Sequence, residues 1–520
     1  MAAPHARRGV VRITHRELRE RTVTADPAVS RAMALVAAVF FIKASLLSLF
    51  LTPLWDVPDE SGHYALVFDI VSGRGLPLMG RSVIPDRIYE SWMRKPAPSP
   101  PMPNWTAQHP PLYHLAAAPF FAAARVVSDD PDWQCRLVRL FSALSGAVAL
   151  LVFFAVFREA SGDSLIAFVA ASGVGFLPMF THMASGVNHD VFLALCMGVA
   201  ALSFVRLAHR GRARDGLAMG AALAAAGATK LSALAPSAVL VLAAAFLLES
   251  RGARRVRDWL GIAALAASLP ALWLLRHRLL LPGVAAHPTG TPLFGLDVFA
   301  YLTRYPVLDH SFKNFVGLIG WTGTGRGDLR WFQIDGPYLL VYLLLACAAA
   351  TLSVVWIERQ EREHPSPLAV RLLSRALALG AFAACFFVFL GGYGGVGLVK
   401  RLAYSLLLAV LFLGAPRVLA AADSRARIVF VSQLSVLVFT AAYLANSLES
   451  FRAHGEMRAT NGRYFFAVLP FLGLGYFEPA ALALSPGRRR HLALAAVFAA
   501  LLLDELAFFL LRVVPFYRAG

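Results

Sequence analysis

The fold follows from apolar runs such as residues 32–52, which read AMALVAAVFFIKASLLSLFLT. A helix of about 20 such residues, rising about 1.5 Å per residue, crosses the hydrocarbon core of a bilayer. Several arginines between positions 7 and 31 precede this run, and no small-residue cleavage site follows it before residue 55. The run is therefore predicted to be a retained signal anchor, with the N-terminus in the cytosol.

The composition also points to a membrane. Of the 520 residues, 58% are hydrophobic and 15% are charged, whereas soluble domains carry about 25% charged residues. The net charge of +18 comes from arginines clustered between apolar runs, where the positive-inside rule explains them, so no nucleic-acid partner is predicted. The cysteines are far apart, which argues against a disulfide framework or a zinc site: Cys135, Cys196, Cys347 and Cys385.

The predicted fold is an all-α polytopic membrane protein with about thirteen transmembrane helices. The run from 216 to 248 is too long for one helix, and Thr229-Lys230 divides it into two short spans. The other predicted spans are 32–52, 137–157, 163–183, 190–208, 258–276, 337–357, 372–392, 402–420, 427–445, 464–482 and 492–514.

The segment Leu112–Val127 decides the topology. It is short and follows a proline-rich stretch; if it lies on the membrane surface, every arginine cluster between spans falls in the cytosol. If it crosses, all of them lie outside. We predict the first arrangement, with the turn at 182–190 on the non-cytosolic side. The predicted regions are a basic cytosolic N-terminus (1–31), a transmembrane module (32–276) with its first outer loop (53–136), a further outer loop (277–336) and C-terminal transmembrane helices (337–520).

The first loop opens with Trp55–Tyr64, which reads WDVPDESGHY. Crowded carboxylates raise the pKa of at least one member, so Asp56, Asp59 and Glu60, with His63 close by, suit a general base or a cation site. The alternative is a solvated helix start, in which Asp59 is the N-cap and Glu60 lies in the first turn.

Two further motifs fall on the same predicted face. His109 begins a His-Pro-Pro-Leu-Tyr stretch, whose alternative role is a rigid elbow, since its prolines fix the backbone. Asn188, His189 and Asp190 place an amide, an imidazole and a carboxylate at the end of a span. Here the alternative is that Asp190 caps the next helix.

Basic and aromatic residues complete the candidate set. Lys230, between two short spans, suits a lipid phosphate, although a snorkelling side chain is the alternative. Lys43 lies mid-span, where it either pairs with a buried acid or takes part in catalysis. Arg463 suits a phosphate. Trp321 suits stacking on a sugar and lies in the same outer loop as Lys313. The stretch that carries Lys313 and Trp321 and the stretch that carries Arg463 are also typical of ordinary membrane anchors.

These motifs, in this order, resemble those of the multispan C-type (GT-C fold) glycosyltransferases, which include aminoarabinose transferases and protein O-mannosyltransferases. The resemblance rests on Pro58-Asp59-Glu60, His109 to Tyr113, Asn188 to Asp190 and Thr229-Lys230. It is nearest to a bacterial multispan family with a Pro-Asp-Glu-x-x-His-Tyr first loop, a Phe-Gly-Trp-like outer loop and a late Gly-Arg-Tyr, here Gly462 to Tyr464.

The resemblance implies a GT-C-like module of seven spans with interfacial helices in the first outer loop. It implies transfer, with inversion, from a polyprenyl-phosphate sugar donor to an envelope glycan, lipid or protein acceptor. The site would lie on the periplasmic side of a bacterial inner membrane. Asp59 would be the base, and the catalytic set would be Asp59, Glu60 and Asp190. The substrate-binding set would be Asp56, His63, Tyr64, His109, Asn188, His189, Lys230, Lys313, Trp321 and Arg463.

The resemblance assigns no metal ligand, but it leaves open a divalent cation at Asp56, Asp59 or Asp190. It also leaves two other functions open. A transporter or flippase of lipid-linked precursors would use charged groups inside spans, such as Lys43. A ligase or phosphotransferase acting on the same lipid carriers would need similar phosphate-binding groups.

Overall fold

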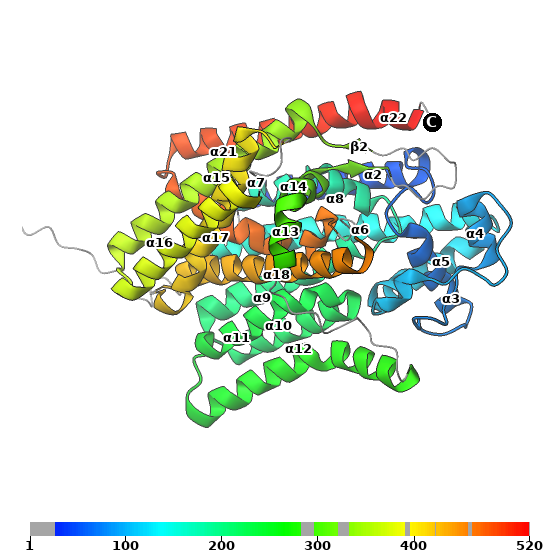
Figure 1. Ribbon diagram of the computed structural model, residues 1–520, viewed down its shortest axis with the longest axis horizontal. Helices are drawn as coiled ribbons and strands as arrows, with labels where there is room; N and C mark the ends of the chain where they lie inside the picture. Colours follow the sequence, from blue (N-terminus) through cyan, green and yellow to red (C-terminus); the bar gives the residue numbers. More distant parts are fainter. Residues whose placement is uncertain are drawn as a thin grey trace, which may run out of the picture.

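A computed structural model describes residues 26–281, 296–320, 332–389, 396–421, 423–455 and 460–518. Within these residues the secondary structure is almost all helical, with a single sheet of two short strands. Long helices lie along the longest axis of the molecule, and the helices of the first loop gather at one end of it (Figure 1). The prediction of an all-α polytopic membrane protein is therefore confirmed.

Ten helices in the described part of the chain are long and apolar enough to cross a membrane. Most contain a predicted apolar run and extend beyond it at one or both ends. They are α2 with η1 (Pro27–Leu51), α6 (Pro131–Ser161), α9 (Asp190–Arg210), α12 (Gly252–Leu280), α15 (Gly336–Glu363), α16 with the start of η4 (Leu368–Val388), α17 with η5 (Leu398–Ala420), α18 (Ser424–His454), η6 to α20 (Gly462–Ala483) and α21 to α22 (Arg488–Arg518).

Some of these spans change helix type along their length. The individual pieces are α2 (Pro27–Leu46), η1 (Leu47–Leu51), α16 (Leu368–Ala383), η4 (Ala384–Phe389), α17 (Leu398–Gly414), η5 (Ala415–Ala420), η6 (Gly462–Val468), α19 (Leu469–Leu472), η7 (Gly473–Phe477), α20 (Glu478–Ala483), α21 (Arg488–Phe508), η8 (Phe509–Val513) and α22 (Val514–Arg518).

The predicted span 163–183 is a bent pair, α7 (Ser164–Gly175) and α8 (Pro178–Ala184), which meet at 64°. Pro178 lacks the N–H that would continue α7, so a new helix begins there. Counting this pair as one span gives eleven. The predicted thirteen also included two short helices, α10 (Ala213–Thr229) and α11 (Leu234–Leu247), and that exact number is not confirmed.

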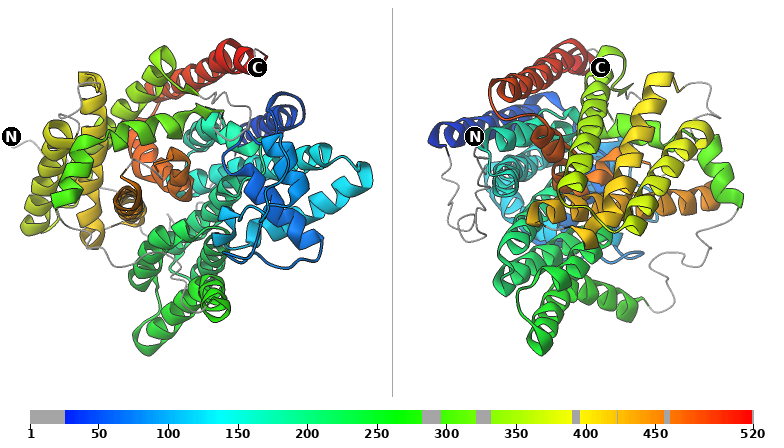
Figure 2. Two further views of the ribbon diagram at one scale, coloured as in Figure 1. Left: turned by 45° about the vertical axis from the view of Figure 1, so that its right-hand side comes forward. Right: turned by 90° about the vertical axis from the view of Figure 1, so that its left-hand side faces the viewer.

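Lys230 separates α10 from α11, as the sequence predicts. Its extended backbone (φ −156°) ends α10, and a short turn, η3 (Leu231–Ala233), leads into α11. Both views in Figure 2 show α10, α11 and α12 (green) projecting together from the bundle. Lys230 therefore sits at a break between helices, where its ammonium group can reach other segments.

The first loop folds into short helices: α3 (Glu60–Val71), α4 (Asp86–Met93), η2 (Trp105–Gln108) and α5 (Leu112–Val127). Helix α5 has 16 residues and buries Tyr113, Ala117, Phe121 and Ala124 on one face. That length is short for a span, and the pattern is that of a helix lying on a surface. The loop has its own apolar core, in which Tyr64 packs against Phe121 with ring centroids 5.6 Å apart.

The later outer loop contributes α13 (Leu296–Arg304), α14 (Val307–Val316), β1 (Leu318–Ile319) and β2 (Phe332–Gln333). The two strands are antiparallel, with Leu318 opposite Gln333. Helix α14 packs against η6, which places this loop beside the start of the span that carries Arg463.

Lys43 lies inside the first span and forms an ion pair with Glu505 of α21. The same carboxylate accepts a hydrogen bond from Thr181 of α8 at 3.2 Å. A buried charge is stable when it is paired, so this contact gives Lys43 a structural role joining α2, α8 and α21.

Helix α9 links the two ends of the bundle, since it runs from Asp190 to Arg210. At the Arg210 end several of the predicted cytosolic arginine clusters meet. Their contacts join Arg210 to Glu159 (2.5 Å), Arg425 to the Ser161 carbonyl (3.1 Å) and Arg490 to Asp163 (2.9 Å). The arginine-rich end and the Asp190 end are thus about 30 Å apart, the length of a 21-residue helix.

Candidate active site

Asp59 has the left-handed backbone conformation (φ 62°) at the N-cap of α3, but its side chain does not cap the helix. One carboxylate oxygen accepts a hydrogen bond from the indole N–H of Trp105 at 2.9 Å. The other forms an ion pair with Arg463. The carboxylate of Asp59 therefore turns away from the helix it precedes and towards two distant segments, which disfavours the helix-cap interpretation.

Glu60 is a buried anchor. Arg139 of α6 binds it bidentately, with both N···O distances at 2.7 Å. The backbone N–H groups of Trp55 (2.8 Å) and Val187 (2.9 Å) donate to the same carboxylate. Arg139 also donates to the carbonyls of Ser48, Thr52 and Pro53, and its side chain is fully buried. This pair ties the first loop to α6 and to the turn before α9.

Asp190 is the centre of a chain of charges. Lys230 donates to its Oδ1 at 2.6 Å, and the Nε of Arg463 lies 3.5 Å from its Oδ2. Arg463 continues to Asp59, and its Nη1 donates to the Pro58 carbonyl at 3.1 Å. The side chain of Lys230 also lies over the ring of Tyr464, 4.5 Å from its centroid. Two cations and two carboxylates from four separate segments thus alternate in one charge chain, in the order Lys230, Asp190, Arg463 and Asp59.

The turn before α9 is fixed to the first loop by Asn188. Its side-chain N–H donates to the Pro58 carbonyl at 3.0 Å, and its side-chain oxygen accepts from the Asp190 N–H at 2.8 Å. Asp190 is the first residue of α9, His189 is the N-cap, and the Asn188 side chain accepts the first N–H of the helix. This leaves the Asp190 carboxylate for Lys230, contrary to the helix-cap interpretation of that residue.

The carboxylates of Asp59 and Asp190 differ in their exposure to solvent. The Asp59 side chain is 26% exposed, whereas the Asp190 side chain is 1% exposed. Burial raises the pKa of Asp59, but Arg463, the Trp105 hydrogen bond and His109 outweigh it, so this pKa lies below its usual value. Asp59 is thus an ionised carboxylate that an outside molecule can reach.

Four histidines surround these charges. His63 Nδ1 lies 3.1 Å from His114 Nε2, and the His189 ring is 4.3 Å from that of His63 and 4.5 Å from that of His109. Burial, then the nearby Lys230, lowers the pKa of His109 to about 3, and burial, then His109, lowers that of His114 to about 3. The pKa values of His63 and His189 are lowered as well, chiefly by burial. The cluster is therefore neutral at pH 7.

This cluster predicts a pH-dependent stability. An unfolded histidine takes up a proton below about pH 6.5, whereas folded His114 does not until about pH 3. Stability is therefore complete above pH 6.5 and falls as the pH drops towards 3, at about 1.4 kcal/mol per pH unit for each such histidine. We expect the melting temperature in detergent to fall between pH 7 and pH 5.

His114→Gln should make that fall shallower, since one of the linked groups is removed. His491→Gln is the matched control, because His491 is exposed at the start of α21. A slope that is equal in the wild type and in His114→Gln would contradict the linkage.

Several predicted site residues lie elsewhere. Asp56 is buried and accepts a hydrogen bond from the Tyr517 hydroxyl at 2.5 Å. Tyr64 belongs to the apolar core of the first loop. Lys313 pairs with Asp309 at 2.8 Å on α14, and Trp321 lies outside the described residues.

A divalent cation does not fit the predicted carboxylates. Asp59 and Asp190 are neutralised by Arg463 and Lys230, and Asp56 is bonded to a tyrosine. Among the residues that the structure describes, no three His, Cys, Asp or Glu side chains are grouped to hold a metal ion.

Sequence reasoning missed Arg139, Trp105 and His114 as members of the site. Arg139 lies inside the apolar run 137–157, and a charge at that depth is itself a signal of a buried partner. His114 stands next to the motif that begins at His109. Trp105 carries no signal that distinguishes it from an ordinary interfacial tryptophan.

Gly462 allows η6 to reach the site. A Cβ atom there would lie 2.1 Å from the Ser311 carbonyl oxygen and 2.2 Å from the Phe315 nitrogen, both backbone atoms of α14. Gly462→Ala should therefore push η6 off α14 and destabilise the protein by about 1–3 kcal/mol, seen as a lower melting temperature.

Gly380→Ala is the matched control for this substitution. It lies in α16 with nothing within 4 Å of its added carbon, and alanine favours the helix. Equal melting temperatures for the two variants would contradict the close packing at Gly462.

Residues 108–275 match the family model of dolichyl-phosphate-mannose-protein mannosyltransferase. This segment begins just before His109 and includes Asp190 and Lys230 of the charge chain. The matched segment is similar to that of a family of membrane glycosyltransferases and covers about a third of this chain. The match confirms the resemblance drawn from the motifs, and it does not favour the transporter alternative. Asp59 and Arg463 lie outside the matched residues.

Among solved structures, this chain is similar to ArnT from Cupriavidus metallidurans in the apo state (14% identity, TM-score 0.37, covering 88% of this chain and 78% of that one). It is also similar to the S. cerevisiae protein O-mannosyltransferase Pmt1-Pmt2 complex (16% identity, TM-score 0.33, covering 48% of this chain and 34% of that one). A third similar structure is that of the Archaeoglobus fulgidus oligosaccharyltransferase (13% identity, TM-score 0.34, covering 88% of this chain and 55% of that one). This chain spans about a third of the length of the S. cerevisiae chain that it matches. No curated protein sequence matches this chain.

Proposed function

We propose that this protein transfers a sugar from a polyprenyl-phosphate donor to a hydroxyl or amine of an envelope glycan, lipid or protein, with inversion at the anomeric carbon. The observation that carries the proposal is the partly exposed Asp59 carboxylate next to a buried guanidinium and a buried ammonium group. The match of residues 108–275 to the family model of dolichyl-phosphate-mannose-protein mannosyltransferase supports this proposal.

Asp59 is the proposed base. The acceptor oxygen or nitrogen attacks the anomeric carbon and loses its proton to the Asp59 carboxylate. The bond between that carbon and the phosphate oxygen breaks, and its electron pair stays on the lipid phosphate. A phosphate leaving group needs charge stabilisation more than a proton, so one base is sufficient.

Arg463 links donor binding to the base. Without donor, its guanidinium pairs with Asp59 and keeps the pKa of that carboxylate low, which makes Asp59 a weak base. A donor phosphate would compete for the guanidinium, and the pKa of Asp59 would rise as its partner is shared. Donor binding would therefore prepare Asp59 to accept the acceptor proton.

The other residues have supporting roles in this proposal. Lys230 binds the phosphate beside Arg463, and Asp190 holds both cations in place. His63, His109 and His189, neutral at pH 7, donate and accept hydrogen bonds to the sugar hydroxyls.

The anchors of the first loop position the base. Glu60 acts through its Arg139 pair, Asn188 through the Pro58 carbonyl and Asp56 through Tyr517. Tyr64 and Lys313 lie in other contacts, and we leave them out of the donor site.

The arginine-rich end of the bundle supports a periplasmic site in a bacterial inner membrane. Loops rich in arginine stay in the cytosol, and the charge chain lies at the other end of α9. The test of the function is mass spectrometry of envelope glycans and lipids from a gene-deletion strain, with and without the wild-type gene restored. Loss of one sugar from one acceptor, regained on restoration, is expected. Identical profiles in all strains would overturn the proposed transfer.

A further inference from the structure

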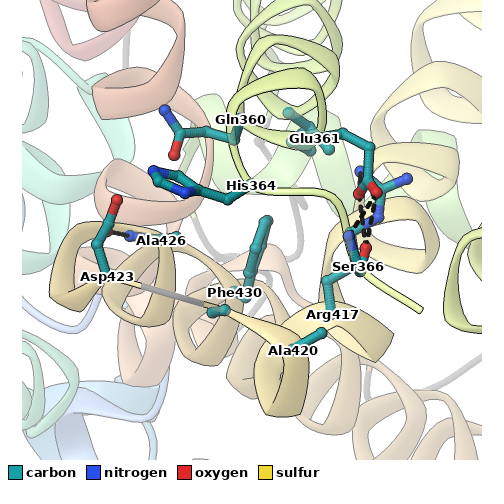
Figure 3. Close-up of a pocket in the computed structure, with 11 residues that line it drawn as sticks. Gln360, Glu361, His364, Ser366, Arg417, Ala420, Asp423, Ala426 and Phe430 are labelled. Atoms are coloured by element: carbon teal, nitrogen blue, oxygen red, sulfur yellow. Dashed lines mark hydrogen bonds and ion pairs between the residues drawn. The ribbon is translucent and has the colours of Figure 1, made fainter.

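A pocket lies where α15 ends, next to η5 and the start of α18. Its lining includes Gln360, His364, Ser366, Arg417, Asp423 and Phe430. Figure 3 shows Arg417 and Asp423 on opposite sides, with His364 and Phe430 between them. The pocket therefore has a basic wall, an acidic wall and an aromatic floor.

The pocket is remote from the charge chain around Asp190. Ser424, the residue after Asp423, lies 3.0 Å from His209 near the C-terminal end of α9. Asp190 begins the same helix, so the two places are about 30 Å apart. The pocket thus belongs to the arginine-rich end of the bundle, and the donor site proposed above does not include it.

Arg417 is the unusual residue of this pocket. Its side chain is 2% exposed, yet none of its three nitrogens makes a hydrogen bond within the described residues. The nearest carboxylates are those of Glu361 at 3.5 Å and Glu358 at 3.8 Å. A buried guanidinium without hydrogen bonds is unfavourable, so these N–H groups favour a ligand that accepts them.

The two glutamates are already engaged by other groups. Glu361 accepts from the Ser366 N–H at 2.8 Å and from the Ser366 hydroxyl at 2.7 Å. Glu358 accepts from Arg375 at 2.8 Å. Both carboxylates thus already accept hydrogen bonds from other groups, and neither accepts one from the Arg417 guanidinium.

The charge on the Arg417 side of the pocket favours an anion. Arg371 lies 3.6 Å from Glu361, so on this side three arginines, at 371, 375 and 417, face two glutamates and leave one positive charge, which the Asp423 carboxylate of the opposite wall balances. On the opposite wall, Asp423 uses Oδ1 to accept from the Ala426 N–H at 2.7 Å. A ligand with a phosphate on the Arg417 side, and a neutral or positive group towards Asp423, would match both walls.

The neighbouring helix points to a lipid as the source of that phosphate. Helix α16 packs against η5, and it carries Arg371 followed by the exposed Leu372 and, further along, Leu379. An acyl chain can lie on these leucines while its headgroup reaches Arg417. We propose that this pocket binds the phosphate of a phospholipid headgroup, through charge-assisted hydrogen bonds from Arg417.

The test measures lipid retention by native mass spectrometry of the purified protein, with phosphatidylglycerol, with a diacylglycerol of the same chains, and with inorganic phosphate. We expect retained phosphatidylglycerol and neither of the other two. Arg417→Gln should weaken phosphatidylglycerol binding by at least about tenfold. Arg359→Gln is the matched control, because Arg359 is exposed near the same end of α15 and does not line the pocket.

Gln360→Glu keeps Arg417 in place and adds a negative charge to the lining, so it tests the site even if Arg417→Gln fails to fold. It should also weaken phosphatidylglycerol binding. Equal retention by the wild type and Gln360→Glu would overturn the proposal. So would diacylglycerol binding as well as phosphatidylglycerol, or binding of inorganic phosphate with no lipid retained.

Discussion

Asp59→Asn is expected to lower the rate of sugar transfer by about 10²–10⁴-fold, the usual contribution of a general base. Asparagine keeps one oxygen, which can accept from the Trp105 indole or from Arg463 but not from both, and it cannot take up the acceptor proton. The binding of donor should persist, because Lys230 and Arg463 remain. The measurement is transfer by the purified protein in vesicles that contain the donor lipid extracted from the native membrane.

Asp86→Asn is the control for this experiment. Asp86 is an exposed carboxylate in the first turn of α4, also in the first loop, and its loss should leave the rate unchanged. A normal rate for folded Asp59→Asn protein would remove Asp59 as the base while leaving the proposed donor and acceptor classes open to the deletion experiment.

Arg139→Met is expected to have the largest effect on stability, about 3–5 kcal/mol. The substitution leaves the Glu60 carboxylate buried without its cation, which is far less favourable than losing both charges. The double variant Arg139→Met with Glu60→Gln should therefore recover part of the loss. Thermal unfolding in detergent of the wild type, both single variants and the double variant measures this coupling.

Arg136→Met is the matched control for this series. Arg136 lies one helical turn before Arg139, is only partly buried, and donates to the carbonyls of Ser48 and Leu49. Its loss should change the stability by about 1 kcal/mol or less. Additive effects of the Arg139 and Glu60 substitutions would contradict a strongly coupled pair.

The membrane architecture could be predicted because it depends on local sequence. An apolar run of about 20 residues has few alternatives to a spanning helix, and breakers such as Lys230 mark where a helix ends. The bend at Pro178 was the exception. The sequence 163–183 is mostly apolar, so its hydrophobicity predicts a single span where the proline forces two helices.

The site was predictable in its members but only partly in its pairing. Asp59, Asp190, Lys230 and Arg463 were all proposed, and the structure brings the four together. The partner of Glu60 was not foreseen, since Arg139 is 79 residues away and only packing between α6 and the loop joins them. Asp56 stands beside the other acids in sequence, but its contact with Tyr517 spans 461 residues.

The pairing of Asp59 with Arg463 has a consequence for synthesis of the chain. These residues are 404 positions apart, so the first loop is made long before its guanidinium partner emerges from the ribosome. Until the segment that begins at Gly462 inserts, the proposed catalytic centre has only Lys230 for the donor phosphate and no counterion for its base. Under the proposed function, turnover therefore starts only when the segment from Gly462 onwards has entered the membrane.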